Sequence, residues 1–66
     1  MSMEYAVQML TERGWAFCAL NNRTTKQFTT SLDEAKDSLA HFRRRFPNSK
    51  FRLACRYVGD WCEAKE

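Results

Sequence analysis

Residues 31–57 combine a capped helix, a helix-ending proline and an alternating strand, and this segment constrains the fold more than any other. Ser31 is a favourable N-cap, and Glu34 three residues later completes a capping box. Pro47 ends the helix, because proline cannot donate the backbone hydrogen bond that another helical turn requires. The sequence therefore predicts a helix over residues 31–46, followed directly by a strand.

One face of the predicted helix is apolar. Its apolar side chains recur at helical spacing and fall within an arc of roughly 80°. They are Leu32, Ala35, Leu39, Phe42 and Phe46. We expect this stripe to pack against the core, with Leu39 and Phe42 at its centre.

Residues 50–58 alternate in character, which is typical of a half-buried strand. We expect one set of side chains to face the helix, namely Phe51, Leu53, Cys55 and Tyr57. The intervening set is expected to face away from the helix, namely Arg52, Ala54 and Arg56.

The N-terminal half contains two apolar runs, residues 5–10 and 15–20, separated by a short segment that includes Gly14. This spacing predicts a β-hairpin. A helix over residues 3–13, with Ser2 as its N-cap and Gly14 just past its end, is the alternative. We prefer the hairpin because it gives the second run a partner strand.

The remaining segments complete the expected fold. A polar turn is expected over residues 21–25, and a short strand over 26–30 with Phe28 pointing inward. The whole chain, residues 1–66, is expected to form one small α+β domain with the order β-β-α-β. Its antiparallel sheet should carry the helix on one face, over Val7, Met9, Trp15 and Phe17 as well as the last strand. The tail after Gly59 is expected to fold back, with Trp61 as its anchor.

The second face of this sheet is the first candidate site, because one helix cannot cover both faces. We expect Ala6, Gln8 and Leu10, then Ala16, Cys18 and Leu20, and finally Arg52, Ala54 and Arg56 to lie there. A solvated face would carry more polar residues, and an exposed apolar patch marks a partner site or a dimer interface. The alternatives are that the tail or residues 21–30 fold over this face, or that it is simply exposed.

A protein partner, or a second copy of the chain, is therefore the leading prediction. The partner-binding residues are predicted to be Gln8, Leu10, Cys18, Leu20, Arg52, Ala54 and Arg56. A chain of 66 residues buries a small core, so association with a partner would be unsurprising.

Nucleic acid is the alternative partner, because the chain has a net charge of +3. Its cations near the helix end and on the following strand could contact phosphates. They are Arg43, Arg44, Lys50, Arg52 and Arg56. Trp15 or Phe17 could then stack on a base. The competing interpretation is that the three consecutive arginines complement the helix dipole and promote solubility.

No motif for catalysis or metal binding is present. The three cysteines and His41 lack the spacings of zinc sites. His41 is predicted to face solvent, so it cannot serve as a base for Cys18 or Cys62. We therefore predict a non-enzymatic protein with no catalytic residues, no metal, no cofactor and no small-molecule substrate.

The sequence also indicates a compartment. No apolar run approaches the length of about 20 residues that spans a bilayer, and no signal-peptide pattern is visible. An odd number of cysteines is a poor disulfide framework. We expect no membrane association and a reducing, cytoplasmic location.

Two segments carry a resemblance to a known group of proteins. Residues 30–36 read TSLDEAK, and residues 46–53 read FPNSKFRL. The chain resembles small bacteriophage and prophage accessory proteins, in which a hairpin precedes such a helix and a terminal strand follows it. The resemblance covers most of the chain but rests on structural positions, so it assigns no functional residue. It implies an origin in a mobile element and a bacterial host protein as the partner.

Overall fold

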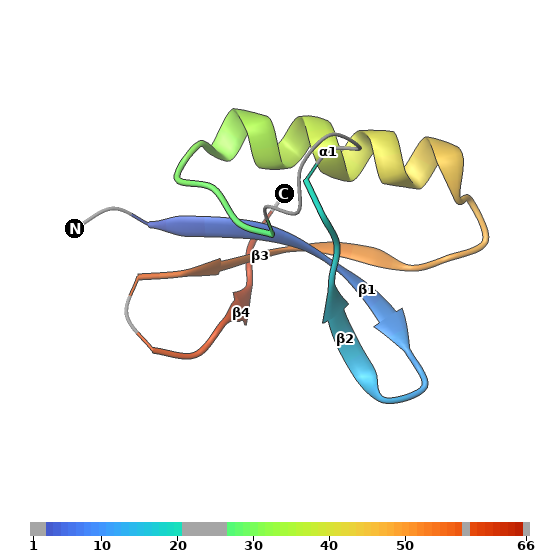
Figure 1. The fold of residues 1–66 in the computed structure, drawn as a ribbon, viewed down its shortest axis with the longest axis horizontal. Helices are drawn as coiled ribbons and strands as arrows, with labels where there is room; N and C mark the ends of the chain where they lie inside the picture. The colour runs from blue at the N-terminus through green and yellow to red at the C-terminus, as the bar shows by residue number, and fades with distance from the viewer. Residues whose placement is uncertain (1–2, 21–26, 58, 66) are drawn as a thin grey trace.

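The chain folds as a four-stranded antiparallel sheet with a helix against one face (Figure 1). The computed structural model describes residues 3–20, 27–57 and 59–65. The elements are β1 (Glu4–Thr11), β2 (Gly14–Phe17), α1 (Leu32–Arg45), β3 (Phe51–Arg56) and β4 (Cys62–Glu63). Their order in the sheet is β2-β1-β3-β4. The predicted α+β fold is confirmed, and β4 is a strand that the sequence pattern did not reveal.

Helix α1 begins and ends where its local chemistry predicts. The side chain of Ser31 accepts a hydrogen bond from the backbone N–H of Glu34 at 3.2 Å, which is the N-cap half of a capping box. The reciprocal half is replaced, because the Ser31 N–H donates to Thr29 Oγ1 at 3.1 Å. At the other end, Phe46 is the C-cap, with φ −128° and ψ 71°. Because its backbone has left the helix, its side chain is 46% exposed. The prediction that Phe46 belongs to the core stripe is therefore wrong.

The predicted hairpin is confirmed, and the alternative helix over residues 3–13 is excluded. β1 pairs with β2 in an antiparallel register in which Leu10 opposes Trp15 and Thr11 opposes Gly14. Gly14 has a φ of 110°, a conformation that residues with a Cβ rarely adopt. The hydroxyl of Thr11 donates to the Gly14 carbonyl at 2.7 Å and closes the turn.

The structure reverses the sheet faces that were predicted for the side chains of the second apolar run, residues 15–20. Directly opposite residues of an antiparallel pair place their side chains on the same face. Leu10 opposes Trp15 and Gln8 opposes Phe17, so both aromatic rings lie on the face away from α1. The prediction that Trp15 and Phe17 pack beneath the helix is therefore wrong.

The same register corrects three further residues that were expected on the second face. Ala16 opposes Met9 and so lies on the helix side of the sheet. Cys18 packs against the core, and Leu20 is buried within it. The chain turns toward α1 after β2, and the Ser38 hydroxyl donates to the Leu20 carbonyl at 2.6 Å.

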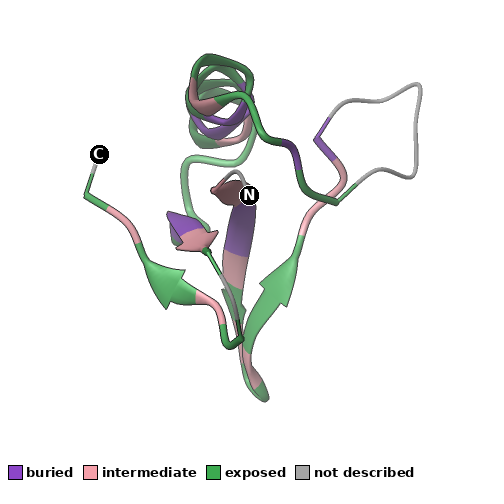
Figure 2. Cartoon of the chain, turned by 90° about the vertical axis from the view of Figure 1, so that its left-hand side faces the viewer, coloured by how far each residue is buried: buried purple, intermediate pink, exposed green. Residues whose placement is uncertain are grey.

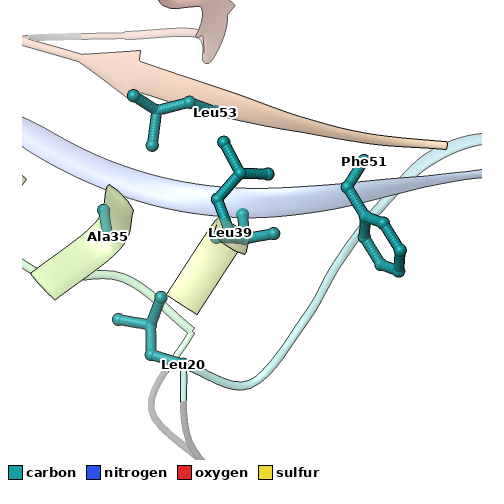
Figure 3. Packing of buried hydrophobic residues seen from close by; sticks show 6 residues of the cluster. Leu20, Ala35, Leu39, Phe51 and Leu53 are labelled. Carbon is teal, nitrogen blue, oxygen red and sulfur yellow. The ribbon is translucent and has the colours of Figure 1, made fainter. Parts of the chain in front are cut away.

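The core lies between α1 and the central strands and is largely aliphatic (Figure 3). Its buried members are Val7, Leu20, Ala35, Leu39, Phe51 and Leu53. Phe42 stacks on Phe51 with ring centroids 5.6 Å apart. The helix-facing prediction is confirmed for Phe51 and Leu53, but Tyr57 is 54% exposed because β3 ends at Arg56.

The segment before α1 also touches the sheet. Tyr5 and Thr29 form an antiparallel bridge, with N–H···O distances of 2.7 and 2.9 Å. Thr29 is buried, whereas its neighbour Phe28 is 43% exposed and lies on the other side of the sheet. The prediction that Phe28 points inward is wrong. The predicted turn over residues 21–25, Lys26 and Val58 lie outside the described residues.

Candidate functional site

The sheet face turned away from α1, here called the helix-distal face, brings together side chains from all four strands. Figure 2 shows β2 and β4 on either side of the central strands and farther from α1 than these strands are. The strand registers place on this face Glu4, Ala6, Gln8, Leu10, Trp15, Phe17, Arg52, Ala54, Arg56 and Glu63. The sequence predicted this face correctly for β1 and β3 and wrongly for β2.

The floor of the helix-distal face is built from small residues. Ala6 and Ala54 oppose each other across β1 and β3, and both are 0% exposed. Gln8, on the same face, is 4% exposed. These residues lie on the side without a helix, so larger side chains of the face itself must cover them. Ala54 and Gln8 were predicted to contact a partner. Because both are buried, they lie beneath the surface of this face instead.

Three aromatic rings form the cover. Phe17 and Trp61 meet edge to face with centroids 5.4 Å apart, and Phe28 lies 6.1 Å from Trp61. Phe17 ends β2, Trp61 immediately precedes β4, and Phe28 precedes α1. The prediction that the tail folds back with Trp61 as its anchor is confirmed. The alternative in which the tail folds over this face is confirmed for the part that Trp61 covers.

Arg52 lies over an indole ring. Its guanidinium carbon lies 4.3 Å from the centroid of Trp15, a cation–π distance. Its Nε donates to Gln8 Oε1 at 2.8 Å, and its Nη1 lies 3.8 Å from Glu63 Oε1. Residues from β1, β2, β3 and β4 thus meet around one guanidinium.

Arg56 has equivalent surroundings at the other end of β3. Its Nε donates to Glu4 Oε1 at 2.7 Å, and its guanidinium carbon lies 4.7 Å from Trp61 and 5.6 Å from Phe28. Both arginines therefore lie against aromatic rings and beside a carboxylate. We call this set the aromatic–arginine cluster: Trp15, Phe17, Phe28, Arg52, Arg56 and Trp61.

The cluster remains accessible to solvent although its members contact one another. Trp15 is 37% exposed, Phe17 38% and Phe28 43%, and Leu10 at the edge of the face is 43% exposed. Aromatic rings carry the largest apolar areas of any side chains. Because Glu4 and Glu63 lie beside the two guanidinium groups, the positive charge at the centre of the face is offset. The arrangement suits contact with another partly apolar surface.

The structure brings together three of the five cations predicted to bind nucleic acid and places the other two elsewhere. Arg43, Lys50 and Arg52 line one open pocket of about 510 Å³, together with Trp15, Pro47, Ser49, Phe51 and Glu63. Arg43 also donates to the Phe51 carbonyl at 3.1 Å. Arg56 lies at the far end of β3 within the aromatic–arginine cluster, and Arg44 is exposed on α1. The pocket therefore combines three of the five predicted residues.

The three cysteines and His41, considered for catalysis or metal binding, do not gather into one site within the described residues. Cys18, Cys55 and Cys62 are free thiols. Burial raises the pKa of the Cys18 thiol. The ring of His41 packs against Phe42 at 5.8 Å. Across residues 3–20, 27–57 and 59–65, no group of three or more His, Cys, Asp or Glu residues is placed to hold a metal ion.

Comparisons of the chain with protein-family models, curated proteins and solved structures found no match. In the described ranges, no helix is long and apolar enough to cross a membrane.

The four aromatic residues of this face were not among the predicted partner-binding residues: Trp15, Phe17, Phe28 and Trp61. A signal for two of them was present. A four-residue connection between the apolar runs implies that Leu10 opposes Trp15, and opposed residues share a face. Phe28 and Trp61 lie in segments without periodicity, so no pattern could assign them to this face of the sheet.

Proposed function

We propose that this protein is a non-enzymatic binding module that engages a protein partner through the helix-distal face. The observation that carries the proposal is the aromatic–arginine cluster, in which solvent-exposed rings surround two guanidinium groups. Tryptophan and arginine are enriched among the residues that dominate protein–protein binding energy. Rings held in place by their neighbours also lose little conformational freedom when a partner binds.

The chemistry of the face favours protein over nucleic acid. A surface for single strands offers open ring faces to bases and cations to phosphates. Here Arg52 covers a face of Trp15, and Arg56 lies over Trp61. The carboxylates of Glu63 and Glu4 stand beside these guanidinium groups and would repel phosphates.

The resemblance to bacteriophage and prophage accessory proteins supports a bacterial host protein, met in the cytoplasm, as the partner. A second copy of the chain would meet the same surface as a symmetric dimer. The two cases are distinguished by sedimentation velocity of the purified protein, which reports self-association without any other component.

Affinity capture from bacterial lysate with three forms of the protein tests the proposal. Trp15→Ser removes an exposed ring from the cluster. Phe46→Ser is the matched control, because it removes a 46%-exposed aromatic ring that lies off the face. A bound protein, or self-association, should weaken by about 30-fold or more with Trp15→Ser, as for a residue that dominates binding. Equal binding by both variants would count against the proposal.

Nucleic-acid binding at the pocket lined by Arg43, Lys50 and Arg52 is the second candidate, because three cations border one cavity. Anisotropy of labelled duplex DNA, single-stranded DNA and RNA at two salt concentrations tests it. Binding through phosphates must weaken steeply with salt. It must also be lost with Lys50→Glu and be less affected by Arg44→Glu, a charge reversal outside the pocket lining.

A further inference from the structure

Two of the three cysteines are placed opposite each other in the sheet. Cys55 of β3 and Cys62 of β4 are direct partners in the antiparallel register. Opposed residues project to the same face, so both thiols lie on the helix side of the sheet. The odd cysteine count argued against a disulfide framework, but the register isolates one pair and leaves Cys18 against the core.

The spacing of this pair suits a disulfide. The N–H of Ala64 donates to the Leu53 carbonyl at 2.8 Å, so Leu53 and Ala64 are a hydrogen-bonded pair. Hydrogen-bonded pairs recur at every second position, which makes Cys55 and Cys62 another such pair, with Cα atoms about 5.5 Å apart. Disulfides join Cα atoms roughly 4.4–6.8 Å apart. The Cα separation of this pair therefore falls within the range that a disulfide bridges.

We propose that Cys55 and Cys62 form a redox modification site that reacts with a low-molecular-weight disulfide such as oxidised glutathione. The Cys62 thiolate attacks one sulfur of the oxidant, forming a mixed disulfide and releasing one glutathione thiolate. The Cys55 thiolate then attacks Cys62 Sγ, forms the Cys55–Cys62 bond and releases the second glutathione. The two protein thiols lose two protons and two electrons, and the oxidant gains them.

The exposures of the thiols set this order of events. Cys62 is exposed and meets the oxidant, whereas Cys55 is half-buried. Cys62 Sγ lies 4.0 Å from the Asp60 carbonyl, a weak thiol contact that opposes reorientation of the side chain little. Cys18 is a poor competitor, because burial raises the pKa of its thiol and so lowers its thiolate fraction.

The disulfide would attach β4, the shortest strand of the sheet, covalently to β3. β4 has two residues, whereas β3, to which it pairs, has six. Trp61 directly precedes Cys62 and contributes to the cover of the helix-distal face. Oxidation would therefore hold Trp61 against Phe17, and reduction would let the tail separate more easily. The proposed redox site does not depend on whether the helix-distal face binds a protein.

Intact mass and peptide mapping of the folded, dilute protein after treatment with oxidised glutathione test the proposal. The monomer should lose the mass of two hydrogens, and its titratable thiols should fall from three to one. Trypsin should release residues 53–56 linked to residues 57–65. A bond involving Cys18, a disulfide-linked dimer, or glutathione adducts that never resolve would each overturn the proposal.

A matched variant tests whether the pairing of β3 with β4 directs disulfide formation, or whether the short separation of the two cysteines in the sequence is sufficient. Cys62→Ser with Glu63→Cys moves the thiol by one residue, to the position opposite Ala54 on the helix-distal face. Closure onto Cys55 should then be at least about tenfold slower, because a shift of one residue reverses the face. If this variant formed the disulfide at the wild-type rate, the β3–β4 pairing would not direct the reaction. That result would refute the proposed redox site.

Discussion

Phe17 and Trp61 meet edge to face with ring centroids 5.4 Å apart, although they come from opposite edges of the sheet. Two central strands separate β2 from β4 in the ladder. The contact is possible because the sheet curls, so that both edge strands lie farther from α1 than the central strands do (Figure 2). The curl of the sheet thus gives the side without a helix a cover made from its own side chains.

The coupling between these two rings is the first prediction. Edge-to-face pairs contribute about 0.5–1.5 kcal/mol beyond the area they bury. A double-mutant cycle with Phe17→Leu and Trp61→Leu, followed by urea denaturation, should give a coupling free energy in that range. Strictly additive effects would mean that the curl does not depend on this contact.

The aliphatic core should control global stability. Leu39 is 4% exposed and lies in the cluster between α1 and the sheet. Leu39→Ala should lower the free energy of unfolding by about 2–5 kcal/mol, from lost burial and the cavity left behind. Leu10→Ala is the control, because Leu10 is 43% exposed and should cost much less. Similar melting curves for the two variants would contradict the assigned core.

The alanine floor should not tolerate enlargement. Ala54 is fully buried beneath the helix-distal face, whereas Ala16 of β2 is exposed. Ala54→Leu should destabilise the fold by about 1–3 kcal/mol, as overpacking typically does. Ala16→Leu should change it little. Thermal unfolding of both variants measures the difference, and a neutral Ala54→Leu would show that the floor is not covered.

The N-cap of α1 makes a measurable contribution. Ser31→Ala removes the acceptor for the Glu34 N–H and should lower the free energy of unfolding by about 1 kcal/mol. Ser31→Asp keeps an acceptor there and should retain the stability. Chemical denaturation of the wild-type protein and the two variants measures these free energies of unfolding. An equal loss in both variants would indicate that Ser31 contributes through something other than capping.

The thiols should differ in reactivity. The thiolate is the reactive form, and a raised pKa means that Cys18 becomes thiolate only at higher pH than an exposed cysteine. Alkylation by iodoacetamide, followed by peptide mass spectrometry, should therefore label Cys62 first and Cys18 last. Raising the pH should accelerate labelling at Cys18 up to its elevated pKa. Labelling of Cys18 as fast as Cys62 at neutral pH would contradict its burial.

Local signals made part of this fold predictable. α1 could be placed because its cap and stop are local, and β3 because its alternation spans the strand. The faces of β2 were assigned wrongly because they were taken from its own apolar residues instead of from the pairing of Leu10 with Trp15. β4 is too short to show a period. The aromatic–arginine cluster depends on the curl of the sheet, which no local pattern encodes.

Adjacent residues of β3 lie on opposite faces of the sheet and make different contacts. Phe51 and Leu53 pack in the core with α1, whereas Arg52 and Arg56 belong to the opposite side of the sheet. A substitution at either arginine therefore alters the outer surface and leaves the helix contacts in place. This separation means that the outer surface can be altered without repacking the core against α1.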